Sequence, residues 1–238
     1  MTQQADSRLP LHARLKDDLN RRISTGEWGP QGALPSEAEL ATAYDVSVGT
    51  MRRVLGEFVA EGVLVRRQGR GTFVRRPSFD NALFRFFRAR GDDNRVPNAR
   101  ILGRDRERPT VQVAEALGKP AQVLHLHRLR LWDSTPFLVE DIWVPLPQFD
   151  HLADIDIDDI GALLYPAYER LTGLVVGAAS EELSVSSADP ATAALLGCEP
   201  GEALMRIERL ARTYAGEVIE YRVSHGVASA FRYRLELQ

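Results

Sequence analysis

Apolar residues recur every four positions near the start of the chain, at Leu11, Leu15, Leu19 and Ile23. Charged residues occupy positions between them, so the spacing predicts an amphipathic helix with one apolar stripe. Gly26 is suited to end this helix, because glycine readily adopts the backbone conformations found at helix ends.

A second and shorter helix is expected from Ser36 to about Ala43. Ser36 is followed three residues later by Glu39, which is the pattern of a capping box, where each side chain accepts a backbone N–H at the helix start. Residues 44–47 then make a turn, and Ser47 can cap a third helix.

The third helix has one apolar face, made by Met51, Val54, Leu55 and Phe58. Small and basic residues lie away from this face or on its flank: Gly49, Thr50, Arg52 and Arg53. Two helices joined by a tight turn form a helix-turn-helix, whose second helix enters the major groove of DNA through its N-terminal residues. Small residues there allow close approach to phosphate, and the two arginines can reach phosphate or guanine.

Two short strands are predicted next, over residues 63–67 and 72–74. Gly69 and Gly71 allow a tight turn with positive φ between them, and Arg70 would stand at its tip, suited to a minor groove or a phosphate. A helical hairpin with a polar outer face would explain the helices but not this basic hairpin. The order of elements therefore predicts a winged helix that binds DNA.

The C-terminal part, residues 91–238, contains a faint internal repeat. Residues 114–118 and 193–197 are similar, and each precedes a strand, a turn and a second strand that contains a glutamate, Glu140 or Glu220. A unit of this kind used twice predicts an antiparallel sheet with helices packed on one side.

Arginines interrupt apolar strand faces in this part of the chain. Two sets alternate onto single faces: Leu124, Leu126, Arg128, Arg130 and Trp132, and Met205, Ile207 and Arg209. Burying an arginine on an apolar face destabilises the fold unless an anion pairs with its guanidinium group. Either the face opens into a pocket for a carboxylate or phosphate, or the arginines pair internally with Glu140 or Glu220, and a pocket built from such pairs satisfies both hypotheses.

Composition and charge agree with this division. The 238 residues, 44% hydrophobic and 26% charged, fit a globular protein of one large or two small domains. The net charge of −3 conceals 12 Lys and Arg against 9 Asp and Glu in residues 1–77. Five arginines fall within residues 66–76, which contain no acid. This is either a basic stripe for a phosphate backbone or a solvated hairpin.

Several classes of protein are disfavoured. No run approaches the roughly 18 apolar residues of a membrane span, residues 1–7 lack the apolar core of a secretory signal, and the single cysteine, Cys198, excludes a disulfide framework and a cysteine-based zinc site. A reducing cytoplasm is expected. The five histidines show no metal-ligand spacing, and His125 and His127 are interpreted as structural or surface residues. No nucleophile-elbow, P-loop or dinucleotide motif occurs, so neither a catalytic residue nor a cofactor is expected.

Residues 9–76 resemble the winged helix of GntR-family regulators. The matching motifs are Leu34-Pro35-Ser36-Glu37, Val46-Ser47-x-x-Thr50-x-Arg52, Glu61-Gly62 and Gln68-Gly69-Arg70-Gly71-Thr72-Phe73-Val74. The resemblance implies DNA contacts from Ser36, Ser47, Thr50, Arg52 and the wing at 69–71. Val48 departs from the pattern, since members commonly carry arginine there, and so does Ala38, at a position that is often basic. The operator sequence therefore cannot be taken from other members.

Residues from about 85 to 238 resemble the effector-binding UTRA domain of the HutC subfamily. The matching motifs are Arg128-Leu129-Arg130, Pro136-x-x-x-Glu140, Ala193-x-x-Leu196-Gly197 and Glu217-Val218-Ile219-Glu220-Tyr221. The resemblance implies an α+β fold like that of chorismate lyase, with a central cavity for sugar phosphates, amino sugars or urocanate-like acids. By this analogy the cavity is lined by Arg128, Arg130, Glu140, Glu220, and Tyr221 or Tyr233.

The sequence thus predicts a repressor with a DNA-binding domain at 8–76, a linker at 77–90 and an effector domain at 91–238. Its expected partners are a pseudo-palindromic double-stranded operator, a small anionic metabolite and a second copy of the chain. Two alternatives stay open: a chorismate-lyase-like enzyme that carries a DNA-binding module, and a DNA-binding protein without a ligand. Turnover of chorismate would favour the first. An all-helical, metal-binding sensor is disfavoured, because the C-terminal part has a β period.

Overall fold

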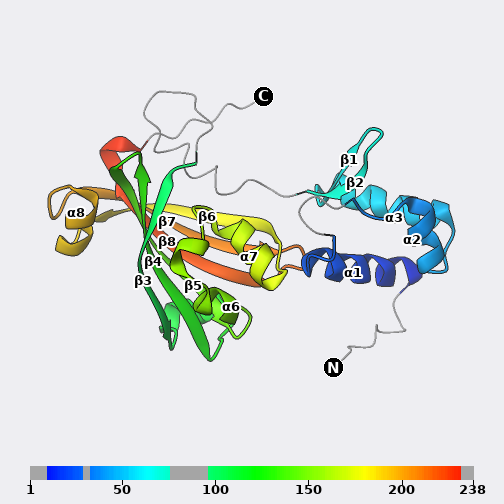
Figure 1. The fold of residues 1–238 in the computed structure, drawn as a ribbon, viewed down its shortest axis with the longest axis horizontal. Helices are drawn as coiled ribbons and strands as arrows, with labels where there is room; N and C mark the ends of the chain where they lie inside the picture. Colours follow the sequence, from blue (N-terminus) through cyan, green and yellow to red (C-terminus); the bar gives the residue numbers. More distant parts are fainter. Residues whose placement is uncertain (1–9, 29–32, 76–95, 232–238) are drawn as a thin grey trace. The chain divides into compact units, whose positions relative to one another are not determined.

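The computed structural model describes residues 10–28, 33–75 and 96–231. The chain divides into two compact units, drawn in Figure 1. One holds residues 1–77 with two short segments, 173–177 and 213–217, and the other holds the remainder. The linker expected at 77–90 lies outside the described residues, so the predicted domain limits stay a prediction.

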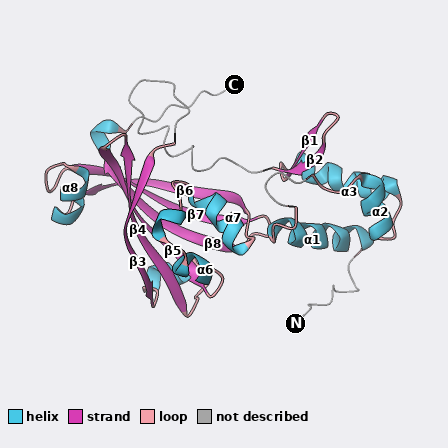
Figure 2. Cartoon of the chain, viewed as in Figure 1, coloured by secondary structure: helices cyan, strands magenta, loops and turns pink. Residues whose placement is uncertain are grey.

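The first unit contains three helices followed by a two-stranded hairpin (Figure 2). The elements are α1 (Leu11–Ser24), α2 (Glu37–Ala43), α3 (Val48–Ala60), β1 (Leu64–Arg67) and β2 (Gly71–Val74). The capping box is present: Ser36 accepts the N–H of Glu39 at 3.2 Å, and the Glu39 carboxylate accepts the N–H of Ser36 at 2.8 Å. The predicted order of elements is confirmed.

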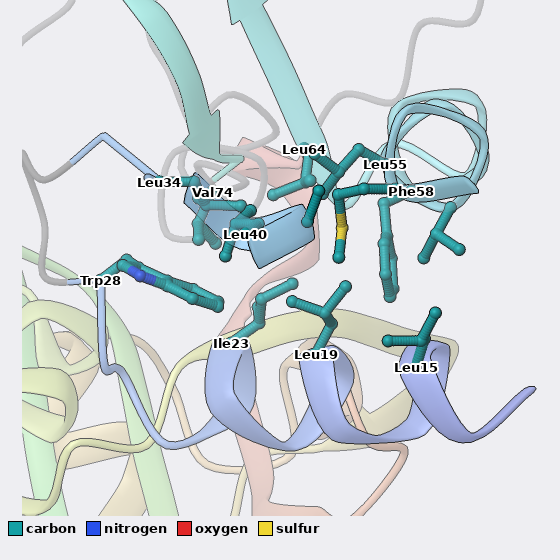
Figure 3. Close-up of a cluster of buried hydrophobic side chains, with 13 residues drawn as sticks. Leu15, Leu19, Ile23, Trp28, Leu34, Leu40, Leu55, Phe58, Leu64 and Val74 are labelled. Carbon is teal, nitrogen blue, oxygen red and sulfur yellow. The ribbon is translucent and has the colours of Figure 1, made fainter. Parts of the chain in front are cut away.

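The apolar stripe of α1 packs against α3 to form the core of this unit (Figure 3). Leu19 and Phe58 are both 0% exposed, and Leu15 and Ile23 are also buried. Leu11, in the first turn, is 50% exposed, so the stripe is buried from its second turn onward. The hydrophobic spacing thus fixes which side of α3 faces inward and which side stays free.

The hairpin has the glycine geometry that its sequence predicts. β1 and β2 are antiparallel, with Leu64 opposite Val74. Gly69 and Gly71 at its turn have φ of 69° and 108°, values that favour glycine because it has no Cβ. The hairpin is therefore the wing of a winged helix.

The second unit is built on one six-stranded sheet, in the order β3-β4-β5-β8-β7-β6. The pairs β3–β4, β4–β5, β5–β8 and β7–β8 are antiparallel. The strands are β3 (Asn98–Glu107), β4 (Gln122–Trp132), β5 (Thr135–Leu146), β6 (Val176–Ser187), β7 (Ala203–Thr213) and β8 (Val218–Val227). The sequence predicted the four inner strands but missed the two edge strands, β3 and β6.

The internal repeat is confirmed and is longer than the sequence indicated. Helix α5 (Val111–Ala116) follows β3 and precedes the hairpin β4–β5, and α8 (Pro190–Leu196) follows β6 and precedes β7–β8. The two strand-helix-strand-strand units meet at β5 and β8, which gives the sheet its mirrored strand order. Cys198, just after α8, is half-buried against the apolar cluster of that helix.

Helices cover both faces of the sheet, so the expectation that they pack on one side is wrong. Val113 and Leu117, at α5, share an apolar cluster with Tyr221 of β8, whereas Tyr168 of α7 (Leu164–Thr172) bonds to Glu220, the preceding residue. Adjacent strand residues point to opposite faces, so α5 and α7 lie on opposite sides. The part of the chain that the structure describes also contains the short helices α6 (Asp150–Asp154), η2 (Ile157–Asp159) and η3 (Ala228–Ala230).

Candidate DNA interface and effector site

The outer side of α3 carries the residues that the sequence assigned to DNA. Met51, Val54, Leu55 and Phe58 are buried, and Gly49 is exposed. The side chains of Arg52 and Arg53 are 64% and 80% exposed. A basic helix face is therefore open to a ligand.

The N-terminus of α3 is capped by the hydroxyl group of Ser47, which also contacts the hydroxyl group of Thr50. The Ser47 side chain accepts the N–H of Thr50 at 3.1 Å, and the two hydroxyl oxygens lie 2.9 Å apart. The first turn contains no acidic residue. The partial positive charge of the helix N-terminus is thus not offset locally, which favours a nearby phosphate.

A groove of about 550 Å³ lies between the start of α2 and the wing. Ser36, Gly69, Arg70 and Gly71 line it together with Arg66 and Arg67. The structure thus brings together the predicted residue of α2 and those of the wing. Ser47, Gly49, Thr50 and Arg53 are not among its lining residues, and they lie at the start and on the open side of α3 instead.

Glu37 connects three parts of this surface and was missed by the sequence analysis as a site residue. Its carboxylate accepts hydrogen bonds from Arg52 of α3 at 2.7 Å and from Arg66 of β1 at 3.0 Å. Its position directly after the N-cap residue Ser36 could have indicated that it lies at this surface. Its effect is to hold two exposed arginines in fixed positions beside the groove.

Three predicted effector residues meet on the sheet of the second unit. Arg128, Arg130 and Glu140 are all 0% exposed. Arg128 and Glu140 are register partners on β4 and β5, and the Arg128 Nε donates to Glu140 Oε2 at 2.7 Å. The strand alternation predicted this common face.

Arg222 joins this pair to the fourth predicted residue, Glu220. Its guanidinium donates to Glu140 at 3.1 Å and to Glu220 at 2.8 Å. Two tyrosines of α7 also donate to Glu220, Tyr165 at 3.2 Å and Tyr168 at 2.6 Å. Arg222 and both tyrosines were missed, although the position of Arg222 two residues after Glu220 places it on the same strand face.

Two more arginines border this cluster. Arg130 donates to the carbonyl oxygens of Pro97, at 3.1 Å, and Ala162. Arg209 of β7 donates to the carboxylate of Glu181, at 2.5 Å, and to the hydroxyl of Tyr165. The sequence had placed Arg209 on the same kind of face as Arg128. The two are linked by a chain of hydrogen bonds through Tyr165, Glu220, Arg222 and Glu140.

Arginine is the most frequent charged residue in this cluster. Among the described residues, four arginines are buried, Arg128, Arg130, Arg209 and Arg222, against the buried carboxylates Glu140 and Glu220. The third carboxylate, Glu181, is 22% exposed in its side chain. Buried charge is costly unless it is compensated, and these arginines and carboxylates compensate one another across the sheet.

The protonation states agree with this interpretation. Burial alone would raise the pKa of Glu140, but the charges of Arg128, Arg222 and Arg130 outweigh it and lower the pKa to about 2. Burial and the neighbouring Glu220 raise the pKa of Tyr168 well above its usual value. At neutral pH the carboxylate of Glu140 is thus ionised, and Tyr168 keeps the proton that it donates.

One predicted effector residue, Tyr221, does not join the cluster. Tyr221 lies on the opposite face of the sheet, where its hydroxyl donates to Glu208 at 2.6 Å and accepts from Gln112 at 2.7 Å. Adjacent residues of a strand face opposite sides, so Tyr221 cannot accompany Glu220 and Arg222. Tyr233 lies outside the described residues.

The face that bears Tyr221 also holds the two strand histidines. His125 and His127 each lie 2.9 Å from the same carboxylate oxygen of Asp141. Burial lowers the pKa of His125, but the hydrogen bond and charge of Asp141 outweigh it, and the pKa is raised overall. Within residues 10–28, 33–75 and 96–231, no three His, Cys, Asp or Glu residues are grouped to hold a metal ion, and no helix is long and apolar enough to cross a membrane.

Both parts of the chain match known families. Residues 11–74 match the gntR family of bacterial regulatory proteins, and residues 92–232 match the UTRA domain. The chain is 28% identical over 220 residues to the HTH-type transcriptional repressor NagR of Bacillus subtilis, covering 90% of this chain and 89% of that protein. It is 31% identical over 216 residues to the histidine utilization repressor of Pseudomonas aeruginosa, covering 88% and 83%.

Solved structures show the same fold. The ligand-binding domain of a GntR-family transcriptional regulator from Bordetella bronchiseptica superposes with a TM-score of 0.53 at 28% identity, covering 60% of this chain and 92% of that one. PhnF from Mycobacterium smegmatis gives a TM-score of 0.55 at 22% identity, covering 94% and 99%. These matches are to regulators and not to enzymes.

Proposed function

Because the chain belongs to the gntR family of bacterial regulatory proteins and carries a UTRA domain, we propose that it is a repressor released from DNA by a small anionic metabolite. The chain is a transcription regulator and not a chorismate-lyase-like enzyme. The observation that supports the proposed ligand class is the gathering of four buried guanidinium groups around Glu140 and Glu220.

DNA contact is assigned to the open side of α3, the start of α2 and the wing. The proposed residues are Ser36, Ser47, Gly49, Thr50, Arg52, Arg53, Gly69, Arg70 and Gly71. The side chains of Arg52 and Arg53 are largely exposed. Arg52 has further N–H donors besides the one that bonds to Glu37, so both guanidinium groups can reach phosphates or base edges. A homodimer would present two such surfaces to the half-sites of a pseudo-palindromic operator. A cytoplasmic location follows from this role.

The effector is assigned to the cluster of Arg128, Arg130, Glu140 and Glu220, with Arg222 and Arg209 added from the structure. The relatives' names link such regulators to the use of metabolites, among them histidine. Carboxylates and phosphorylated sugars share the chemistry that a guanidinium recognises, which is a planar or branched set of anionic oxygens. The proposed domain limits remain 8–76, 77–90 and 91–238.

Two variants test this function. Operator duplexes are first selected from a random library with the full chain, and a metabolite panel of sugar phosphates, amino sugars and small carboxylates is then screened by thermal shift. A true effector should stabilise the chain by about 2–3 kcal/mol at 100 times its Kd. Arg52→Ala should weaken operator binding at least tenfold without a change in melting temperature. Arg128→Ala, assayed below the temperature at which its second unit begins to melt, should bind operator normally but no longer respond to the effector.

The outcomes separate the two assignments. Operator binding by Arg52→Ala at the wild-type level would refute the assignment of α3 as the recognition helix. An effector response by Arg128→Ala equal to that of the wild type would refute the assignment of the buried cluster. A neutral metabolite as the strongest ligand of the panel would refute the anionic class.

A further inference from the structure

An exposed apolar side chain stands at the start of α3, where a DNA-reading helix presents its first residues. Val48 is the first helical residue after the cap Ser47, and it is 40% exposed. It is not among the residues that form or pack against the core of the first unit. Side chains lean toward the N-terminus of a helix, so Val48 extends toward that end rather than along the helix.

Several hydrogen-bonding groups next to Val48 have partners within the protein. The hydroxyls of Ser47 and Thr50 lie 2.9 Å apart, and the N–H of Thr50 donates to Ser47. Arg52, one turn later on the same side, donates to Glu37 at 2.7 Å. Val48 therefore offers a base pair an apolar contact, beside groups that bonds within the protein already orient.

Ala38 is a second exposed apolar side chain, in the first turn of the neighbouring helix α2. It directly follows Glu37, the carboxylate that holds Arg52. Both helix starts that border the DNA-reading surface thus carry small apolar side chains at exposed positions. Neither residue can donate a hydrogen bond to a guanine.

Base pairs differ in what they offer to such a side chain. In the major groove, guanine shows two acceptors and cytosine an amino group, whereas thymine shows a C5 methyl group. Pressing a valine against a guanine or cytosine edge would strip polar groups of water without replacing their hydrogen bonds. The C5 methyl group of thymine makes no hydrogen bonds to water, so the same contact with valine only buries apolar surface, which is favourable.

We propose that Val48 contacts the C5 methyl group of a thymine in each operator half-site and thereby selects a T·A pair at that position. This inference rests on the proposed DNA contact of α3 and adds its specificity. Operators of this protein then carry a thymine where a chain with arginine at this position would take a guanine.

The test removes the methyl group from the DNA and the side chain from the protein. In an operator selected with the full chain, each thymine is replaced in turn by deoxyuridine, which keeps every hydrogen-bonding group, and affinity is measured by fluorescence anisotropy at fixed salt. One thymine per half-site should show about a fourfold loss on replacement, the value for one buried methyl group. Val48→Ala should show less than a twofold effect at the same position.

Two further variants complete the design. Leu11→Ala, which removes an equally apolar side chain that is 50% exposed on α1, should give the wild-type deoxyuridine profile. Selection with Val48→Arg should yield sites in which that T·A pair is replaced by G·C. Val48→Ala and Val48→Arg should both melt near the wild-type temperature, because the side chain is exposed.

The failures are distinguishable. If Arg52→Ala loses operator binding but the deoxyuridine profiles of wild type and Val48→Ala coincide, the Val48 proposal is wrong and the DNA interface stands. The same conclusion follows if Val48→Arg selects the wild-type sites. If the wild-type chain selects no sequence at all, or Arg52→Ala binds normally, both proposals fail.

Discussion

Replacing Glu140 by glutamine removes one negative charge from the centre of the second unit and preserves the shape of the side chain. Glu140 is 0% exposed and accepts hydrogen bonds from Arg128 at 2.7 Å and from Arg222 at 3.1 Å. An amide can accept from only one of its two terminal atoms. Glu140→Gln therefore leaves two buried guanidinium groups without their shared counter-charge.

The cost can be worked out in two ways. A pKa of about 2 in the folded protein, against an ordinary value of 4.5, corresponds to about 3 kcal/mol of folding free energy at pH 7. Removal of one partner from a buried ion pair typically costs about 3–5 kcal/mol. We therefore expect Glu140→Gln to destabilise the second unit by about 3 kcal/mol at neutral pH.

The sign of the pH dependence follows from the lowered pKa. A carboxyl group whose pKa is lower in the folded state stabilises the fold above its unfolded pKa, and that contribution is lost as the pH falls. Wild type and Glu140→Gln should thus differ fully at pH 7, and about half of the difference should be gone at pH 3. Urea unfolding of both proteins at pH 7 and pH 3 measures this difference in the free energy of unfolding.

Hydrogen exchange followed by mass spectrometry localises the effect to one unit. Peptides from β4, β5 and β8 should exchange faster in Glu140→Gln, whereas peptides from α1 and α3 should not change. Glu182→Gln, at an exposed position on β6, is the matched control and should exchange as the wild type does. Equal protection of the three strands in Glu140→Gln and wild type would refute the reasoning that this charge supports the fold.

Three further changes test other parts of the fold. Leu19→Ala should destabilise the first unit by about 3 kcal/mol, since the side chain is 0% exposed, and a loss under 1 kcal/mol in urea unfolding would contradict this packing. Gly56→Ala should raise its stability by about 0.5–1 kcal/mol, because a Cβ there meets no atom within 4 Å; a lower melting temperature would show a hidden clash. His125 has a raised pKa, so its stabilising contribution is full below pH 6.5 and is lost as the pH rises through the folded value. His125→Gln should flatten the stability profile between pH 6 and 9, and an unchanged profile would rule out this group as its cause.

The first unit could be predicted almost completely, because its signals are local. Caps, glycines and the four-residue spacing of α1 are set within a few neighbouring positions, and the structure has them where the sequence indicates. The inner hairpins of the second unit were also predictable from their repeated order. The edge strands β3 and β6 were not, since most of their residues are exposed or half-exposed, and a strand of that kind needs no apolar alternation.

The buried cluster proposed as the effector site was predicted in part, for a related reason. Arg128 and Glu140 share a strand face by simple alternation, and the structure pairs them. Tyr221 was assigned to the cavity from the family resemblance, although strand geometry places it on the face opposite Glu220. The contribution of α7 depends on tertiary packing, so no local pattern of the sequence could have assigned Tyr165 and Tyr168 to Glu220.

The single cysteine after α8 allows the effector domain to be labelled at one site. The sequence contains a single cysteine, and Cys198 is free and half-buried, so its sulfur remains accessible from one side. A spin label or maleimide dye attached there would mark each subunit once, without prior removal of other thiols. In a dimer the two labels would report one intersubunit distance, which allows the response to operator and effector to be followed in solution.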